Sequence, residues 1–476
     1  MNRLCLAILI LFAARLFGNE LGDLLRQADE NHPLLQAERA VVEQMVCAHD
    51  ELAEFLDPSL YAAAGADTRL RNLPMVPAGY AQPRVHDSLE AQAGVLVPLE
   101  SGAYISAGGV FRRWFHPDAG YDRMYQHLLG VNLQIPLLRD RGFALYGHRR
   151  SAAMAQVCAA TNRLLSVSQT IRHDVETAYI TACFAAVNHG IRQDATLRFE
   201  KTYEEARELA RLKTIPEYQV QTALRDLQTG KEDQIAAEQT RQAALVTLAQ
   251  TVGIQKLDNE LTCTPADFLQ AALEIGEMPS GNAQDALQRR GELLALQDDW
   301  LAADAQRALE EEEHKDQLSL NLGVNWQGDS RHGAVSAYRE YTDHNWGGEA
   351  MIVWTRPLDY AGSSARTAKA QARLKELEAR QEALRIQITA EVRCAQLRFQ
   401  AAVQRLALAQ GSVAAAQSTL QAEQERFRLG ESTSTIVLDA QKELNNILLR
   451  QSAAAMELLQ ANAELQYALG YPEDSN

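Results

Sequence analysis

The sequence predicts a mainly α-helical protein that combines long antiparallel coiled-coil helices with a transmembrane β-barrel. Three observations lead to this fold class: two uninterrupted helical patterns, a repeated arrangement of long and short helices, and stretches in which apolar and polar residues alternate. Glycine (27) and proline (13) are sparse among the 476 residues, and aromatic residues make up only 6%. This composition favours closely packed helices over a thick globular core.

The two long helical patterns cover residues 143–212 and 363–429. In the second, apolar residues recur every three or four positions from Leu374 to Leu420 without a proline, which is typical of a coiled-coil seam. Many of these positions are alanine, so neighbouring helices can approach closely. Each helix is expected to reach about 100 Å at ~1.5 Å per residue. Such lengths indicate a rod or a tube, because helices of globular proteins are several times shorter.

Each long pattern is followed by a returning helix of half its length, at residues 216–252 and 433–469. Two further half-length helical patterns, at residues 20–55 and 283–315, are expected to stack end to end with the returning helices. The sequence therefore predicts two repeats, each with one long helix and two half-length helices.

Matching residues of the two halves keep a constant offset of 217 positions, for example Leu212 with Leu429 and Gly253 with Gly470. A constant offset indicates a duplication. We therefore expect a first repeat over residues 19–258 and a second repeat over residues 283–476. The segment between them, residues 259–282, is expected near the equator of the helices.

In each repeat the pattern changes to a period of two, over about residues 59–136 and 318–357. The clearest alternation places apolar side chains on one face, which we expect to contact lipid: Leu318, Leu320, Leu322, Val324 and Trp326. Four of the five tryptophans lie in or beside these stretches, as in the aromatic girdles of membrane proteins. A soluble sheet with one buried face gives the same alternation, so the strands alone leave both possibilities open.

The first 18 residues are expected to be a secretory signal peptide. Arg3 precedes an apolar run that is too short to span a membrane, and cleavage is expected near Gly18. No later stretch reaches the ~18 consecutive apolar residues of a membrane helix. The signal peptide and the length of the helices favour the barrel over the soluble sheet.

Charge and cysteine content exclude several classes of function. The net charge of −16 argues against a nucleic-acid partner. The six cysteines are scattered, and the acidic run at residues 310–313 before His314 reads as a solvated helix face. The sequence contains no nucleophile elbow, phosphate-binding loop or paired-acid pattern. We therefore expect no enzyme, no catalytic residue, no metal and no cofactor.

Four motifs resemble the TolC-like outer-membrane efflux protein family. Residues 31–35 (N-H-P-L-L) are similar to its N-P-x-L start, and residues 135–142 (I-P-L-L-R-D-R-G) to its exit from a strand into a long helix. Residues 356–362 are a weaker copy of that exit. The strongest similarity covers residues 426–441 (R-F-R-L-G-E-S-T-S-T-I-V-L-D-A-Q), at the turn into the last returning helix.

This resemblance implies a homotrimer in the outer membrane of a diderm bacterium. Four strands from each subunit form a 12-stranded barrel, and the helices form a tunnel across the periplasm. The family implies a passive conduit for efflux or type I secretion, which a periplasmic adaptor protein connects to an inner-membrane RND or ABC transporter. The alternative is a periplasmic coiled-coil structural or adaptor protein without a membrane barrel.

The chain departs from the family in its first strand region, which contains two additional alternating runs at residues 89–97 and 103–113. These runs are expected either to add a hairpin to the barrel or to form an extracellular elaboration. The sequence does not decide between four and six strands per subunit.

The resemblance also assigns site residues. Asp439 is expected to face the pore and to form a three-fold carboxylate ring, beside an apolar ring at Ile436. The exposed tips of the two helical hairpins, which would contact the adaptor, are expected at Leu212, Lys213, Thr214, Leu429, Gly430 and Glu431. The family links its hairpins through charged residues, but the matching positions here are Gln219, Phe427 and Ser432. We therefore expect closure by apolar contact around Phe427 and Ile436, together with neutral hydrogen bonds from Gln219.

Overall fold

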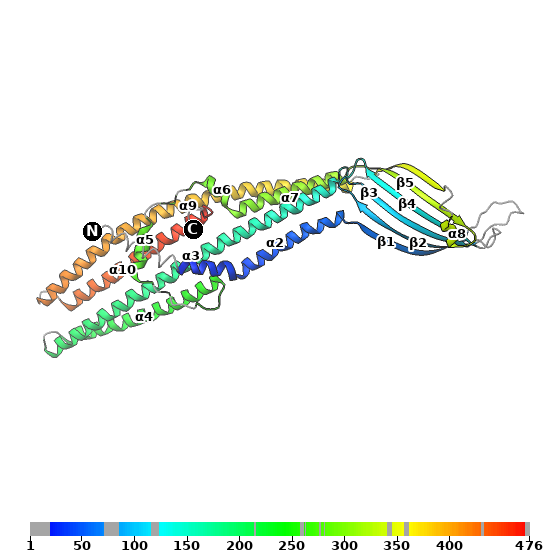
Figure 1. Ribbon diagram of the computed structural model, residues 1–476. Helices are drawn as coiled ribbons and strands as arrows, with labels where there is room; N and C mark the ends of the chain where they lie inside the picture. The colour runs from blue at the N-terminus through cyan, green and yellow to red at the C-terminus, as the bar shows by residue number, and fades with distance from the viewer. Residues whose placement is uncertain are drawn as a thin grey trace, which may run out of the picture. The chain divides into compact units, whose positions relative to one another are not determined.

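The computed structural model describes most of the chain, and its described ranges are residues 20–70, 85–115, 123–213, 216–257, 261, 263–275, 278–279, 281–339, 345–356, 361–429 and 433–471. The chain divides into two compact units. The first contains the described parts of Met1–Val42, Ala159–Gln297 and Arg380–Asn476, and the second those of Glu43–Cys158 and Asp298–Ala379. Helices predominate, as the sequence predicted (Figure 1).

Two very long helices lie where the two long patterns occur. Helix α3 spans Ala144–Arg211 and helix α9 spans Ala361–Arg428, each with 68 residues. Their returning partners are α4, Glu217–Val252, and α10, Ser434–Ala468 (Figure 1). The glycines that follow α4 and α10 adopt the left-handed conformation that suits a helix end, with φ of 87° at Gly253 and 78° at Gly470.

The half-length helices are not continuous, which corrects the expectation for residues 20–55. A helix over residues 20–31 stops at His32, because the residue before a proline is disfavoured in helical conformation. Helix α2 then spans Pro33–Glu51, and a 3₁₀ turn, η1, covers Leu52–Leu56.

The pattern at residues 283–315 is likewise divided into α6, Ala283–Arg289, and α7, Gly291–Glu313. The break at Arg290 lets its side chain enter the interior. Its guanidinium lies 3.2 Å from carboxylate oxygens of both Glu292 and Glu391, and 4.6 Å from the centre of the Tyr467 ring. These partners satisfy a buried charge that would otherwise be costly.

One large apolar cluster joins helices of the first unit. Val175 and Cys183 of α3, Ile388 of α9 and Leu465 of α10 are fully buried in it. The inter-repeat segment contributes a helix that the sequence analysis did not identify, α5 over Pro265–Glu274, whose Phe268 is buried in the same core.

The second unit contains one antiparallel sheet of six strands in the order β1-β2-β3-β4-β5-β6. The strands are β1 (Ser59–Leu70), β2 (Val85–Pro98), β3 (Tyr104–Phe115), β4 (Met124–Pro136), β5 (Gln317–Ser330) and β6 (Trp346–Thr355). A short helix, α8 (Ala334–Arg339), follows β5. The two additional alternating runs form β2 and β3 and lie between β1 and β4 (Figure 1).

The start of α7 offers a test of how closely its backbone approaches α3. A Cβ atom at Gly291 would lie 2.6 Å from the carbonyl oxygen of Asn162 and from the amide nitrogen of Ser166. We expect Gly291→Ala to destabilise the fold by about 1–3 kcal/mol through overpacking. Gly411→Ala in α9, where a Cβ meets nothing within 4 Å, is the control and should be neutral or stabilising by up to about 1 kcal/mol. Thermal unfolding of both purified variants in detergent measures the difference, and equal melting temperatures would contradict this packing.

Candidate functional site

The turns that end α3 and α9 carry the residues expected at the hairpin tips. Leu212 follows α3 and Leu429 follows α9, and their exposed fractions are 67% and 73%. Lys213 adopts a left-handed conformation with φ of 57°. A non-glycine residue pays about 1–2 kcal/mol for this conformation. Thr214, Gly430, Glu431 and Ser432 lie outside the described residues.

Near these turns, α10 contacts the hairpin formed by α3 and α4 through an ion pair. The ammonium nitrogen of Lys442 on α10 lies 2.8 Å from a carboxylate oxygen of Asp226 on α4. The Asp226 side chain is only 6% exposed, whereas that of Lys442 is 40% exposed. The other oxygen of this carboxylate accepts from the Arg225 guanidinium of the same helix at 3.1 Å. Removing Lys442 would therefore leave the buried carboxylate with Arg225 alone and without its link to α10.

Two hydrogen bonds join α10 to α3 beside this ion pair. The guanidinium of Arg198 donates to the side-chain carbonyl of Asn445, and the amide of Gln441 donates to the Thr202 hydroxyl at 3.4 Å. Burial lowers the pKa of Arg198, and the nearby Asp194 carboxylate opposes that shift. The guanidinium nevertheless remains protonated, because arginine does not lose its proton in proteins.

We call these six residues the cross-hairpin layer: Arg198, Thr202, Asp226, Gln441, Lys442 and Asn445. An apolar cluster lies next to it, in which Leu438 of α10 packs with Phe199 of α3 and Leu227 of α4. Asp226 and Lys442 were not predicted from the sequence, because only the positions that link the two hairpins in the family were considered. Asp226 could have been found in the sequence, because it is a charged residue between the apolar positions Ala223 and Leu227. A charged residue on a buried helix face requires a partner.

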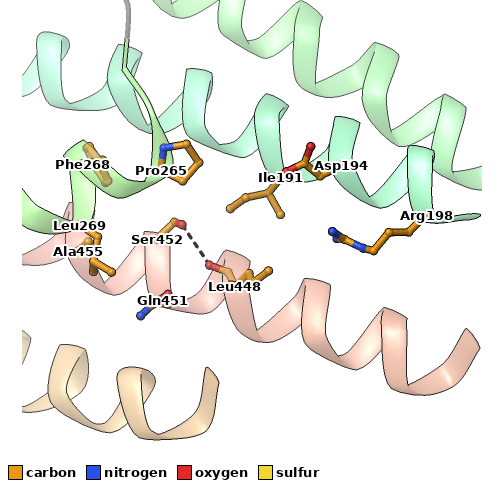
Figure 2. A pocket seen from close by; sticks show the side chains of 10 residues that line it. All are labelled: Ile191, Asp194, Arg198, Pro265, Phe268, Leu269, Leu448, Gln451, Ser452 and Ala455. Atoms are coloured by element: carbon orange, nitrogen blue, oxygen red, sulfur yellow. Dashed lines mark hydrogen bonds between the residues drawn. The ribbon is translucent and has the colours of Figure 1, made fainter. Parts of the chain in front are cut away.

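A small cavity lies farther along α10, where it meets α3 and α5 (Figure 2). The lining residues are Ile191, Asp194 and Arg198 of α3, Pro265, Phe268 and Leu269 of α5, and Leu448, Gln451, Ser452 and Ala455 of α10. Its volume of about 140 Å³ is below the ~300–1,000 Å³ of pockets that bind drug-sized ligands. The Ser452 hydroxyl is already used, since it donates to the Leu448 carbonyl at 3.1 Å. This cavity therefore does not constitute a site for such a ligand.

The side of α10 opposite its buried residues carries an exposed stripe. Ile436 is 47% exposed, and Asp439 and Glu443 are also exposed. Their spacing of three and four residues puts all three on one face. Val437 and Leu438, by contrast, are buried. Glu443 was not among the predicted site residues, although it follows Asp439 by one helical turn.

The other residues expected at the gate are not brought together by the described contacts. Gln219 is half-buried in the first turn of α4. Phe427 lies in the last turn of α9, but its side chain is outside the described part of the structure, as is all of Ser432. Ile436 is exposed. The expected closure around Phe427 and Ile436 therefore stays a prediction.

The apolar residues of β5 share one face of the sheet. Leu322, Val324 and Trp326 are 38%, 42% and 42% exposed, and Leu318 and Leu320 are half-buried. In register with Val324 and Trp326, β4 places Val131 and Leu129, both exposed. An exposed apolar face of this extent is unusual for a protein surrounded by water.

Among the described helices, none combines the length and the apolar character that a membrane crossing requires.

Comparison with known proteins gives one family match and several similar structures. Residues 282–471 match the model of the outer membrane efflux protein family, which confirms the resemblance indicated by the motifs. The structure is similar to that of CusC, described for transmembrane channel formation, with a TM-score of 0.68 and 15% identity over 95% of this chain and 92% of that chain. No curated protein sequence matches the chain.

Two further similar structures are outer-membrane proteins of named bacteria. VceC from Vibrio cholerae has a TM-score of 0.65 and 18% identity over 95% of this chain and 96% of that chain. The open state of the MtrE outer membrane channel of Neisseria gonorrhoeae has a TM-score of 0.67 and 16% identity over 96% of this chain and 90% of that chain. The fold of these channels therefore extends over almost the whole chain.

Proposed function

We propose that this chain is one subunit of a homotrimeric export channel. Two findings support the proposal: residues 282–471 match the outer membrane efflux protein family, and the fold is that of solved outer-membrane channels. The channel lies in the outer membrane of a diderm bacterium and has a long periplasmic part. It is a passive conduit and not an enzyme. The observation that carries this proposal is the exposed apolar face of the sheet, opposite a face that carries Asn321 and Asn325.

The strands also explain why several copies are needed. Within the described residues, β1 and β6 each pair on one side only, so two rows of backbone groups lack strand partners. A bilayer does not tolerate open strand edges, and pairing β6 of one copy with β1 of the next removes them. Each copy thus contributes one part of a closed barrel. A periplasmic coiled-coil or adaptor protein, the alternative, would leave the apolar face in water.

The partners follow from the family and from the exposed tips. An adaptor protein is proposed to dock at Leu212, Lys213 and Leu429, which stand at the helix ends. The adaptor would connect the channel to an inner-membrane RND or ABC transporter that supplies the energy, in a tripartite efflux or type I secretion system.

The lipid-facing assignment is tested by two adjacent substitutions on β5. Leu322→Arg puts a charge on the apolar face and should destabilise insertion by about 2–4 kcal/mol near the midplane of the bilayer. Asn321→Arg, on the opposite face, is the matched control and should be much better tolerated. Folding yield in liposomes measures both variants, and equal losses would refute the assigned face.

The exposed stripe of α10 is proposed to face the pore. Asp439 and Glu443 would then form two carboxylate rings one turn apart, which adds a second ring to the one expected at Asp439 beside Ile436. Carboxylate rings favour cations and bind divalent ions.

In planar bilayers, we expect Asp439→Asn to reduce both cation selectivity and block by millimolar divalent ions, because it removes charge at nearly constant size. Asp439→Ala should act similarly, and Glu443→Gln should add to the effect. Glu274→Gln, an exposed acid on α5, is the control and should change neither property. Undiminished block in the Asp439 variants would remove this residue from the pore.

The cross-hairpin layer is proposed to hold the resting channel closed, because it ties α10 to the first hairpin. This layer would act in addition to the expected closure around Phe427, Ile436 and Gln219. If each of three Asp226–Lys442 pairs contributes about 0.5 kcal/mol, their loss shifts the open-to-closed equilibrium about tenfold.

Single-channel recording tests the gate with Lys442→Met, which should increase the resting open probability about tenfold and weaken its dependence on salt. Lys231→Met, an exposed residue of α4, is the control and should leave both unchanged. A Lys442→Met channel as closed as the parent would show that the ion pair does not contribute to closure.

A further inference from the structure

We infer that the hairpin of β2 and β3 belongs to the barrel wall, so that three copies form an eighteen-stranded barrel that is wider than the twelve-stranded barrel of the family. This inference rests on the proposed trimeric channel and adds the width of its outer exit. The alternative is that the hairpin is an elaboration outside the barrel.

Backbone pairing makes the hairpin continuous with both of its neighbours. β2 pairs with β1 from Ser59↔Leu96 to Leu70↔Val85, along all twelve residues of β1. β3 pairs with β4 from Tyr104↔Gln134 to Trp114↔Met124. Removing the hairpin from the sheet would break both ladders, and β1 would then pair directly with β4.

Side-chain alternation keeps the same apolar face across all six strands. One row of laterally paired residues runs from β1 to β6 as Leu60, Val95, Ala107, Val131, Val324 and Gly348. The next row is Ala62, Ala93, Gly109, Leu129, Trp326 and Trp346. A hairpin outside the membrane has no need to continue this face, whereas a strand in the barrel wall requires it.

On the opposite face of the sheet, side chains of the hairpin pack against β1 and against each other. A Cβ atom at Gly94 or Gly108 would lie 2.5 Å or 2.8 Å from the Tyr61 hydroxyl oxygen, so these glycines make room for the tyrosine across three strands. On the same face, Arg112 of β3 donates to the Glu90 carboxylate of β2 at 2.9 Å. Charged and polar groups on this face suit a water-filled lumen.

The turn of the hairpin is also fixed. Gly102 has φ of 81°, and a Cβ there would lie 2.8 Å from the carbonyl oxygen of Asp140 and from the amide nitrogen of Phe143. These two residues belong to the turn between β4 and α3. The β2–β3 turn is therefore packed at the helix end of the sheet, where the strands meet the start of α3.

The number of strands determines the width of a barrel. Strands about 4.8 Å apart and tilted by about 40° give a backbone diameter of about 24 Å for twelve strands and about 36 Å for eighteen. Because each copy contributes an even number, β6 and the β1 of the next copy run antiparallel and the barrel can close.

The two widths are distinguished by distances between identical spin labels in the assembled trimer. Three copies of Val131 in the barrel wall form a triangle whose Cα–Cα side is about 31 Å for eighteen strands and about 21 Å for twelve. In a full-length chain with its native cysteines replaced, a nitroxide at Val131→Cys points outward and lengthens this side, and a nitroxide at the neighbouring Asn132→Cys points inward and shortens it. The mean of the two label–label distances therefore reports the Cα–Cα side. The matched variant lacks residues 85–115, which comprise β2 and β3. Pulsed electron paramagnetic resonance should give a distance about 10 Å longer in the full chain.

The experiment gives different results if only the eighteen-stranded barrel is wrong and if the proposed trimeric channel is wrong as well. A trimeric mass with a distance near 21 Å in the full chain would overturn the eighteen-stranded barrel and leave the channel intact. A monomeric mass without a label–label distance would overturn both. If the deletion variant fails to assemble, the full chain still decides between the two widths, because the mean of the outward and inward label distances cancels the length of the label.

Discussion

The proposed function depends on an open sheet and on what its two free edges require. Six strands satisfy one another through continuous ladders, but the outer edges of β1 and β6 have no strand partner within the described residues. One face is apolar and exposed, and the other carries charged and polar groups. In water both the edges and the apolar face invite aggregation, and in a bilayer open edges are more costly still. Closure with further copies resolves both problems at once, which is why the proposed function follows from the sheet.

The helices meet different requirements at different points along their length. Around Arg290 and Phe268 the packing is tight, and the buried charge has two carboxylates and an aromatic ring as partners. Nearer the turns, the contact between α10 and the first hairpin passes through the polar cross-hairpin layer. Polar contacts are weaker than a packed core and respond to ionic conditions. Tight packing around Arg290 and Phe268, with polar contacts near the turns, is an arrangement suited to opening near the turns.

Much of the fold could be predicted from the sequence. The long helices α3 and α9 were evident because their apolar residues recur every three or four positions for many turns, and β5 because its alternation is regular. The break at His32 could have been predicted from the neighbouring Pro33 but was overlooked. The break at Arg290 could not, because it depends on buried partners far away in the sequence. Helix α5 was missed because its ten residues fall within a segment interpreted only as a connection.

The candidate site was predicted less well than the fold. Asp439 and Ile436 do lie on an exposed face of α10, but Glu443 and the pair Asp226–Lys442 were overlooked. Partners on different helices, 216 positions apart in the sequence for Asp226 and Lys442, have no local pattern that relates them. Register between helices, which only the packed structure supplies, determines which charges meet.

The most direct test of the account is the location and mass of the native protein. Cells are fractionated, the membranes are separated by density, and the protein is extracted in detergent for mass determination by light scattering. The account predicts that the chain is recovered with the outer membrane and has the mass of three copies. A soluble periplasmic monomer would contradict it.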